Sequence, residues 1–228
     1  TTVMTSPGSA NACGGTMAIL KTAGRMADRM QIGTGVKFAL GENPKSVYND
    51  RDETPITRMA TAAMIREGLA KAQRYQQELD FAESDPDEHM PDYDAKSEAL
   101  LPLLERDVKA HFHCHRADDI CTAIRIAKEF NLDYVIIHGT EGHLIADILA
   151  EENAPVIAGP ILCDRCKPEM QHLTISGPSI MQKAGVKLAL CTDHPVIPIQ
   201  YLPTTAALAV KGGMQREDAL YAITAGAA

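Results

Sequence analysis

The chain has 228 residues, an apolar content of 45% and a formal net charge of −8 at pH 7. This length suits one large domain with a buried core. The acidic balance argues against a nucleic-acid partner, which would need a basic surface, and no apolar run approaches the roughly 20 residues that span a bilayer. Six dispersed cysteines are typical of a reduced, cytoplasmic protein.

The N-terminal half mixes strands and helices without a regular order. The expected elements are a strand at 2–6, a helix at 16–30, a strand within "TGVKFALGE" (34–42), a long helix at 55–81 and a short helix at 96–106. The helical region at about 55–106 is long for a strand-to-strand connection. We interpret it as a helical insertion that serves as a lid, as a homo-oligomer contact or as an elaborated helix of the fold.

The second half alternates short apolar strands with helices. Strands are expected at 108–114, 134–138, 154–159 and 186–193, with helices at 118–130, 142–152, 178–184, 203–211 and 215–225. This alternation predicts an α/β fold with a parallel sheet covered by helices. Either a doubly wound sheet or most of a (β/α)8 barrel would accommodate it.

Three of these strands end in residue types that bind metals. His113 and His138 end two strands, and Asp193 ends the last one. Because the carboxyl ends of parallel strands carry the chemistry of such folds, we expect a site there. Neutral imidazoles and a carboxylate suit zinc or a similar divalent ion, and a carboxylate beside the activated water can act as general base.

These segments resemble known motifs. "HFHCHRADDI", "VIIHGTEGH" and "LCTDHPVIPIQY" resemble the later metal motifs of the amidohydrolase superfamily, most closely its imidazolonepropionase-like branch with prolidase-type members. "TTVMTSPGSAN" and "VKFALGENPKSVY" resemble early segments of that branch. The resemblance implies a single domain over 1–228 that is a metal-bearing (β/α)8 barrel, here incomplete because the first strand and the flanking β-sandwich are not in the chain. Both chain ends are therefore expected to lie within a longer protein.

The resemblance also implies roles for individual residues. His113 and His138 correspond to the ligands on the fifth and sixth strands, and Asp193 to the eighth-strand aspartate that touches metal and acts as acid and base. A further ligand comes from Glu42 or, alternatively, from a carboxylated Lys37. The expected cofactor is one or two divalent ions, zinc in the first instance.

Four residues beyond the strand ends are candidates for substrate binding. They are His115, Arg116, His143 and His194. The alternatives are a plain helix-entry role for His115 and Arg116, a solvent-facing position for His143 and a rim position for His194. The sequence thus predicts a hydrolase that attacks C–N bonds of a small molecule, such as an amide, cyclic amide or amidine. The alternatives are an aminohydrolase that deaminates a ring, and a degenerate, non-catalytic barrel that binds metal or a partner.

Overall fold

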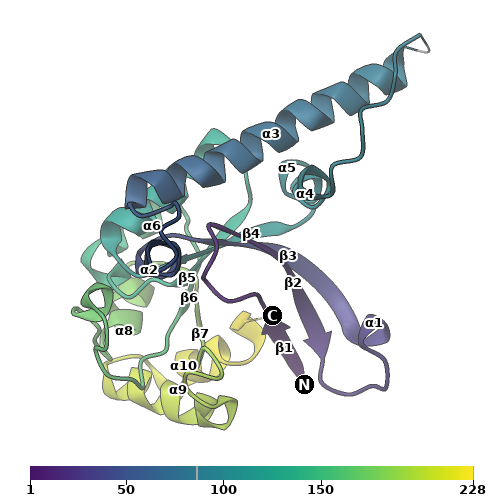
Figure 1. Cartoon of the computed structure of the whole chain (residues 1–228). Helices are drawn as coiled ribbons and strands as arrows, with labels where there is room; N and C mark the ends of the chain where they lie inside the picture. The colour runs from purple at the N-terminus through teal and green to yellow at the C-terminus, as the bar shows by residue number, and fades with distance from the viewer. Residues whose placement is uncertain (86, 228) are drawn as a thin grey trace. The chain divides into compact units, whose positions relative to one another are not determined.

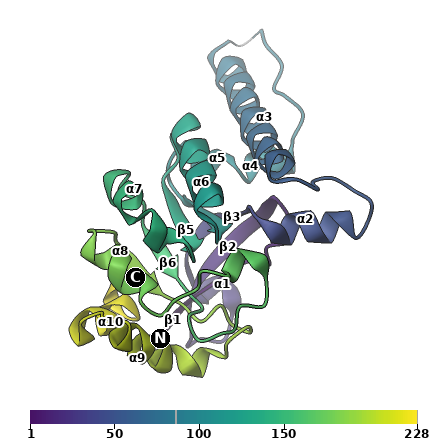
Figure 2. The same ribbon diagram turned by 90° about the vertical axis from the view of Figure 1, so that its left-hand side faces the viewer.

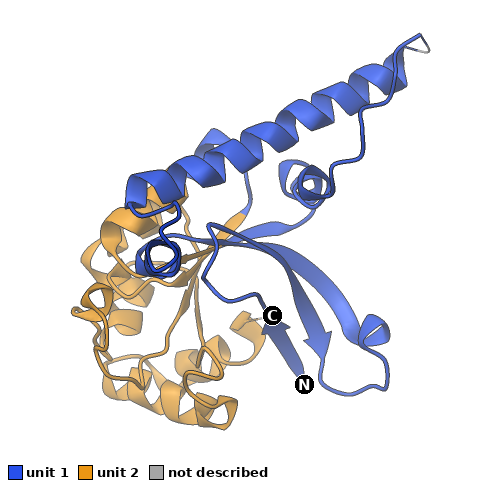
Figure 3. Ribbon diagram, viewed as in Figure 1, with its two compact units in different colours: residues 1–111, 126–133 blue, residues 112–125, 134–228 orange. Residues whose placement is uncertain are grey.

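The computed structural model describes residues 1–85 and 87–227, and the chain divides into two compact units. Figure 3 colours them separately: unit 1 comprises Thr1–His111 and Ile126–Asp133, and unit 2 comprises Phe112–Arg125 and Tyr134–Ala228. The expectation of one domain over the whole chain stays a prediction. No helix in the described part of the chain combines the length and apolar character needed to cross a membrane.

Unit 1 contains an antiparallel sheet in which β2 (Cys13–Lys21) lies between β1 (Thr2–Thr5) and β3 (Gln31–Ala39). The helix expected at 16–30 is therefore wrong, since only the short α1 (Ala27–Met30) forms there. The alanine, methionine and leucine content of this segment favours a helix locally. Pairing along both edges of β2 satisfies its backbone groups instead, and this tertiary context overrides the propensity.

The helical region of unit 1 follows its expected pattern. Helix α3 spans Arg58–Ser84 (Figure 1). Its N-terminus is capped by Thr57, whose side chain accepts a hydrogen bond from the Ala60 N–H at 3.0 Å. Apolar residues recur along its buried face at helical spacing, and Ile65 and Leu69 are completely buried. The other helices of unit 1 are α2 (Glu42–Asn49), α4 (Ala95–Glu98) and α5 (Leu101–Leu104).

Two elements cross the unit boundary, namely β4 (Lys109–Cys114) and α6 (Ala117–Glu129). Unit 2 continues with β5 (Tyr134–His138), η1 (Gly142–Leu144), α7 (Ala146–Glu151), β6 (Val156–Ala158), η2 (Pro168–Met170), α8 (Gly177–Lys183), β7 (Leu188–Leu190), η3 (Ile199–Tyr201), α9 (Leu202–Lys211), α10 (Arg216–Ala222) and η4 (Ala225–Ala227). Strands alternate with helices, so the predicted α/β fold is confirmed.

The strands of unit 2 are parallel and in register at their carboxyl ends. His138 pairs with Ala158, and Ala158 pairs with Leu190, so β5, β6 and β7 end at one edge of the sheet. Helices α7 to α10 lie along one side of these strands (Figure 2). Ile136 and Leu149 are fully buried between strand and helix layers, as expected for apolar strands covered on their faces. The loops that follow these strands carry polar side chains, among them Thr140, Glu141 and Asp193.

Candidate metal centre

Backbone hydrogen bonds join the carboxyl end of β4 to the turn that follows β5. The Gly139 N–H donates to the Cys114 carbonyl at 3.0 Å, and the Glu141 N–H donates to the His115 carbonyl at 2.8 Å. Gly139 has a φ of +53°, a conformation that glycine adopts without steric cost. The turn therefore leaves β5 sharply, and the side chains at the two strand ends come together.

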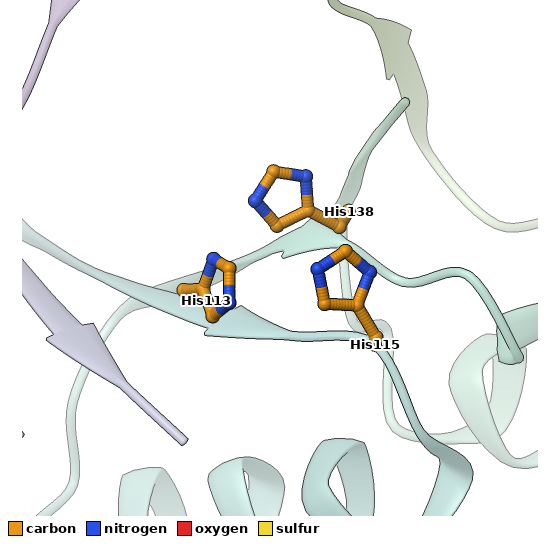
Figure 4. Close-up of side chains that lie close together, drawn as sticks. All are labelled: His113, His115 and His138. Carbon is orange, nitrogen blue, oxygen red and sulfur yellow. The ribbon is translucent and has the colours of Figure 1, made fainter. Parts of the chain in front are cut away.

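Three histidines meet at this edge of the sheet. The ring centroid of His138 lies 4.5 Å from that of His113 and 4.5 Å from that of His115, and the His115 and His138 rings are stacked (Figure 4). One ring nitrogen from each residue lies within 4.8 Å of the others. All three side chains are buried, each residue being only 3% exposed. We call this group the histidine triad.

The backbone fixes the ring state of His138. Its Nδ1 lies 2.6 Å from the carbonyl oxygen of Gly159. A carbonyl can only accept, so Nδ1 carries a proton, and the neutral form of this ring has its lone pair on Nε2. His138 also has a φ of 75°, which is uncommon for a residue other than glycine and typical of functional positions. The strained backbone and the hydrogen bond together set the direction of the ring.

His115 is held in a similar way by a side chain. Its Nδ1 lies 2.7 Å from Oγ1 of Thr140, in the turn after β5. Burial, with smaller contributions from His138 and Lys167, lowers the pKa of His115 to about 2. The imidazole is therefore neutral at physiological pH, which is the form that ligates a metal ion.

A buried carboxylate lies next to His115. Glu169 in η2 is 1% exposed, and its Oε1 lies 3.0 Å from Nζ of Lys167 and 3.7 Å from Nε2 of His115. A charge this deeply buried is costly to desolvate unless it is paired. Lys167 provides the pairing, so the edge of the triad carries an ion pair.

A second carboxylate, that of Glu141, forms hydrogen bonds with the loops around the triad. Glu141 accepts a hydrogen bond from the Ala117 N–H, at the start of α6, at 2.8 Å. Its other carboxylate oxygen lies 2.7 Å from Nδ1 of His172, beyond η2. Glu141 also donates its own N–H to the His115 carbonyl. It therefore links three segments around the triad, namely those that follow β4, β5 and η2.

The donor set fits a divalent metal ion. Imidazole nitrogens are common ligands of zinc and other transition metals, and three of them from a rigid scaffold are a known catalytic set. Within residues 1–85 and 87–227, the triad is the one group of three or more metal-binding side chains close enough to share an ion. The chain can thus hold such an ion through His113, His115 and His138.

The triad includes one residue that the sequence pattern did not place among the expected ligands. The structure brings His113 and His138 together, as expected from their strand-end positions. It adds His115, for which a substrate contact was predicted. The sequence does contain a signal for this grouping. Side chains of an extended chain alternate between its two sides, so His113 and His115 lie on the same side of the backbone.

The remaining predicted site residues of unit 2 lie outside the triad. Asp193 and His194 follow β7 and are exposed. Arg116 forms a two-pronged ion pair with Asp118, with N–O distances of 2.9 and 3.0 Å. His143 is half-buried, with its Nδ1 3.0 Å from the Thr140 carbonyl oxygen. The roles assigned to these residues stay predictions.

Glu42 and Lys37 belong to unit 1. Glu42 is the first residue of α2, and Lys37 is a buried residue of β3, only 5% exposed. The choice between them as a further ligand also stays a prediction.

The fold and the triad define an α/β protein with a candidate metal centre at the carboxyl ends of its strands. No family model matches the chain. A solved structure, an amidohydrolase from Thermotoga maritima MSB8, is 41% identical and superimposes with a TM-score of 0.96. The match covers 99% of this chain and 59% of that one.

A curated relative carries the same kind of name. The chain is 27% identical over 245 residues to "Amidohydrolase tasK" of Hapsidospora irregularis. The match covers 96% of this chain but only 25% of that protein, so the chain spans a part of both relatives. Both likenesses support the amidohydrolase resemblance of the sequence.

Proposed function

We propose that this chain carries the metal centre of an amidohydrolase-type hydrolase that cleaves C–N bonds in small molecules. The observation that carries the proposal is the buried triad of His113, His115 and His138 at the ends of adjacent strands. The two relatives named amidohydrolases support it independently. We further propose a (β/α)8 barrel for the whole protein, and the imidazolonepropionase-like branch on the motifs given above.

The residues of the chain would divide the chemistry between them. The triad holds the cation, which we propose to be zinc, through its ring nitrogens. When bound, such an ion polarises a carbonyl and lowers the pKa of a bound water to about 7. Asp193, three residues past β7, accepts the proton that water loses on attacking the amide carbon and delivers it to the departing amine. Arg116, His143 and His194 follow strand ends in the same unit and are our candidates for substrate contacts.

Metal content and hydrolysis, measured on the same preparations, test this proposal. The wild-type protein should bind Zn²⁺ and release amine from a member of a panel of N-acyl amino acids, dipeptides and cyclic amides. His138→Ala should lose the metal, whereas Asp193→Asn should lose turnover. His89→Ala, which alters an exposed histidine of unit 1, should leave metal binding unchanged. A wild-type protein that takes up no metal would contradict the proposal.

A further inference from the structure

The ion pair beside the triad has no part in the chemistry proposed above. Lys167 and His115 both approach the same oxygen of Glu169, with Nζ at 3.0 Å and Nε2 at 3.7 Å. The Lys167 side chain is 30% exposed, whereas that of Glu169 is fully buried. A fixed positive and a fixed negative charge thus lie within a few ångströms of one ring of the triad.

The ring nitrogen of His115 that faces this pair is the one suited to hold a cation. Its Nδ1 is engaged by Thr140 at 2.7 Å, so Nε2 is the nitrogen directed toward Glu169. A separation of 3.7 Å is longer than a hydrogen bond. The carboxylate therefore acts on this nitrogen mainly through its charge.

The sign of the two charges matters for a divalent ion. Three neutral imidazoles contribute no negative charge, while the ammonium of Lys167 repels a cation and the carboxylate of Glu169 attracts it. Both effects are strengthened by the low effective dielectric of a buried site. The same carboxylate oxygen of Glu169 lies 3.0 Å from Nζ of Lys167 and 3.7 Å from Nε2 of His115, so its charge acts on both neighbours.

We propose that Glu169 is a positioning residue of the metal centre, which cancels the charge of Lys167 beside His115 and so allows the triad to bind a divalent cation tightly. This inference rests on the proposed function, because it requires the triad to bind metal. It adds to that function a charge-balancing pair outside the ligands themselves.

The test is a double-mutant cycle on Zn²⁺ affinity, measured by competition with a chromogenic chelator. Glu169→Gln should weaken binding by about 10- to 100-fold, the usual effect of removing a group behind a ligand. Lys167→Met should bind at least as tightly as the wild type. The double variant Lys167→Met/Glu169→Gln should recover most of the lost affinity, because the ammonium whose charge Glu169 offsets is removed as well. A purely structural role of Glu169 predicts no such rescue.

Loss of metal affinity must be distinguished from loss of folding, because removing one partner of a buried ion pair destabilises a protein. The melting temperature of each metal-free variant is measured first. Glu169→Asp keeps the charge and should retain affinity. If Glu169→Gln does not fold, Glu169→Asp and the double variant are each compared with the wild type, and both should bind nearly as tightly as it does. Glu98→Gln is the matched control: Glu98 accepts a hydrogen bond from the Tyr75 hydroxyl at 2.6 Å in unit 1, and its loss should leave affinity unchanged.

Three results would be decisive against the inference. Wild-type affinity in Glu169→Gln, or a double variant as weak as Glu169→Gln, overturns the role of Glu169 while leaving the proposed function intact. Absence of metal binding by the wild-type protein overturns the proposed function as well.

Discussion

His138 donates its Nδ1–H to the backbone carbonyl of Gly159, over 2.6 Å, from the end of β5 to the residue that follows β6. The parallel register explains the contact, since His138 lies opposite Ala158 in the neighbouring strand. A main-chain acceptor cannot rotate away as a side chain can. The orientation of a candidate ligand is therefore built into the sheet itself.

Gly159→Ala should disturb this orientation. A Cβ at position 159 would lie 2.2 Å from the carbonyl oxygen of Cys191, and the residue has a φ of +135°. Because the clash is with backbone, the strand end must shift, and the carbonyl that holds His138 shifts with it. We expect lower stability in urea unfolding and weaker Zn²⁺ binding by about tenfold in chelator competition.

Gly185→Ala is the control that distinguishes the steric clash at position 159 from the strain that alanine has at any positive φ. Gly185 also has a positive φ, +96°, but a Cβ there would meet no atom within 4 Å. This control should lose roughly 1–2 kcal/mol of stability, because alanine is strained at a positive φ, and should keep its metal affinity. Equal metal binding by both variants and the wild type would show that the Gly159 carbonyl does not orient the ligand.

The Thr140 hydroxyl should matter for metal binding through His115. Thr140→Val removes the group 2.7 Å from Nδ1 while keeping the size and branching of the side chain. We expect Zn²⁺ affinity to fall by roughly tenfold. Thr140→Ser keeps the hydroxyl and should bind as the wild type does. If the valine and serine variants have the same affinity, the ring of His115 is oriented by something else.

Much of unit 2 could be predicted from the sequence because its signals are local. The run "YVIIH" is apolar and bounded by polar residues, and β5 has the predicted limits, Tyr134–His138. Helix α6 begins within one residue of its predicted start, where acidic residues favour a helix N-terminus. The strand at Cys13–Lys21 could not be found in this way, because its pairing partners lie elsewhere in the chain.

The same distinction applies to the candidate site. His113 and His138 could be predicted because each ends an apolar strand, and a parallel sheet brings such ends to one edge. Gly159 and Glu169 carry no local signal, since their contacts with the triad depend on strand register and on the path of a loop. Groups that orient ligands from a distance in sequence become visible only in three dimensions.

Asp94 should make stability depend on pH in the acid range. Its carboxylate pairs with Lys71, accepts from the Ser97 hydroxyl at 3.0 Å and caps α4 through the Lys96 N–H at 3.1 Å. The Lys71 and Ser97 contacts lower the pKa of Asp94 to about 2.

The sign of this linkage follows from the lowered pKa. The contribution of Asp94 is fully present above the unfolded-state pKa, near 4, and is lost as pH falls through about 2. Unfolding curves between pH 5 and pH 2 should therefore be less pH-dependent for Asp94→Asn than for the wild type. An NMR titration of the Asp94 carboxyl carbon provides the direct check, and a midpoint near 4 in the folded protein would contradict the assignment.

Two cysteines of unit 2 should differ sharply in reactivity. Cys114, at the end of β4, is completely buried, and burial, with help from Asp119 and Glu169, raises the pKa of its thiol well above the usual range. Cys166 lies in the loop before η2 and is exposed. Because the thiolate is the reactive form, iodoacetamide should modify Cys166 in the native protein and reach Cys114 only after denaturant is added. Peptide mapping by mass spectrometry measures both sites, with the denatured protein as the reference for full labelling. Native labelling of Cys114 at the rate of Cys166 would mean that this strand end opens readily, and the rigid scaffold argued for the triad would not hold.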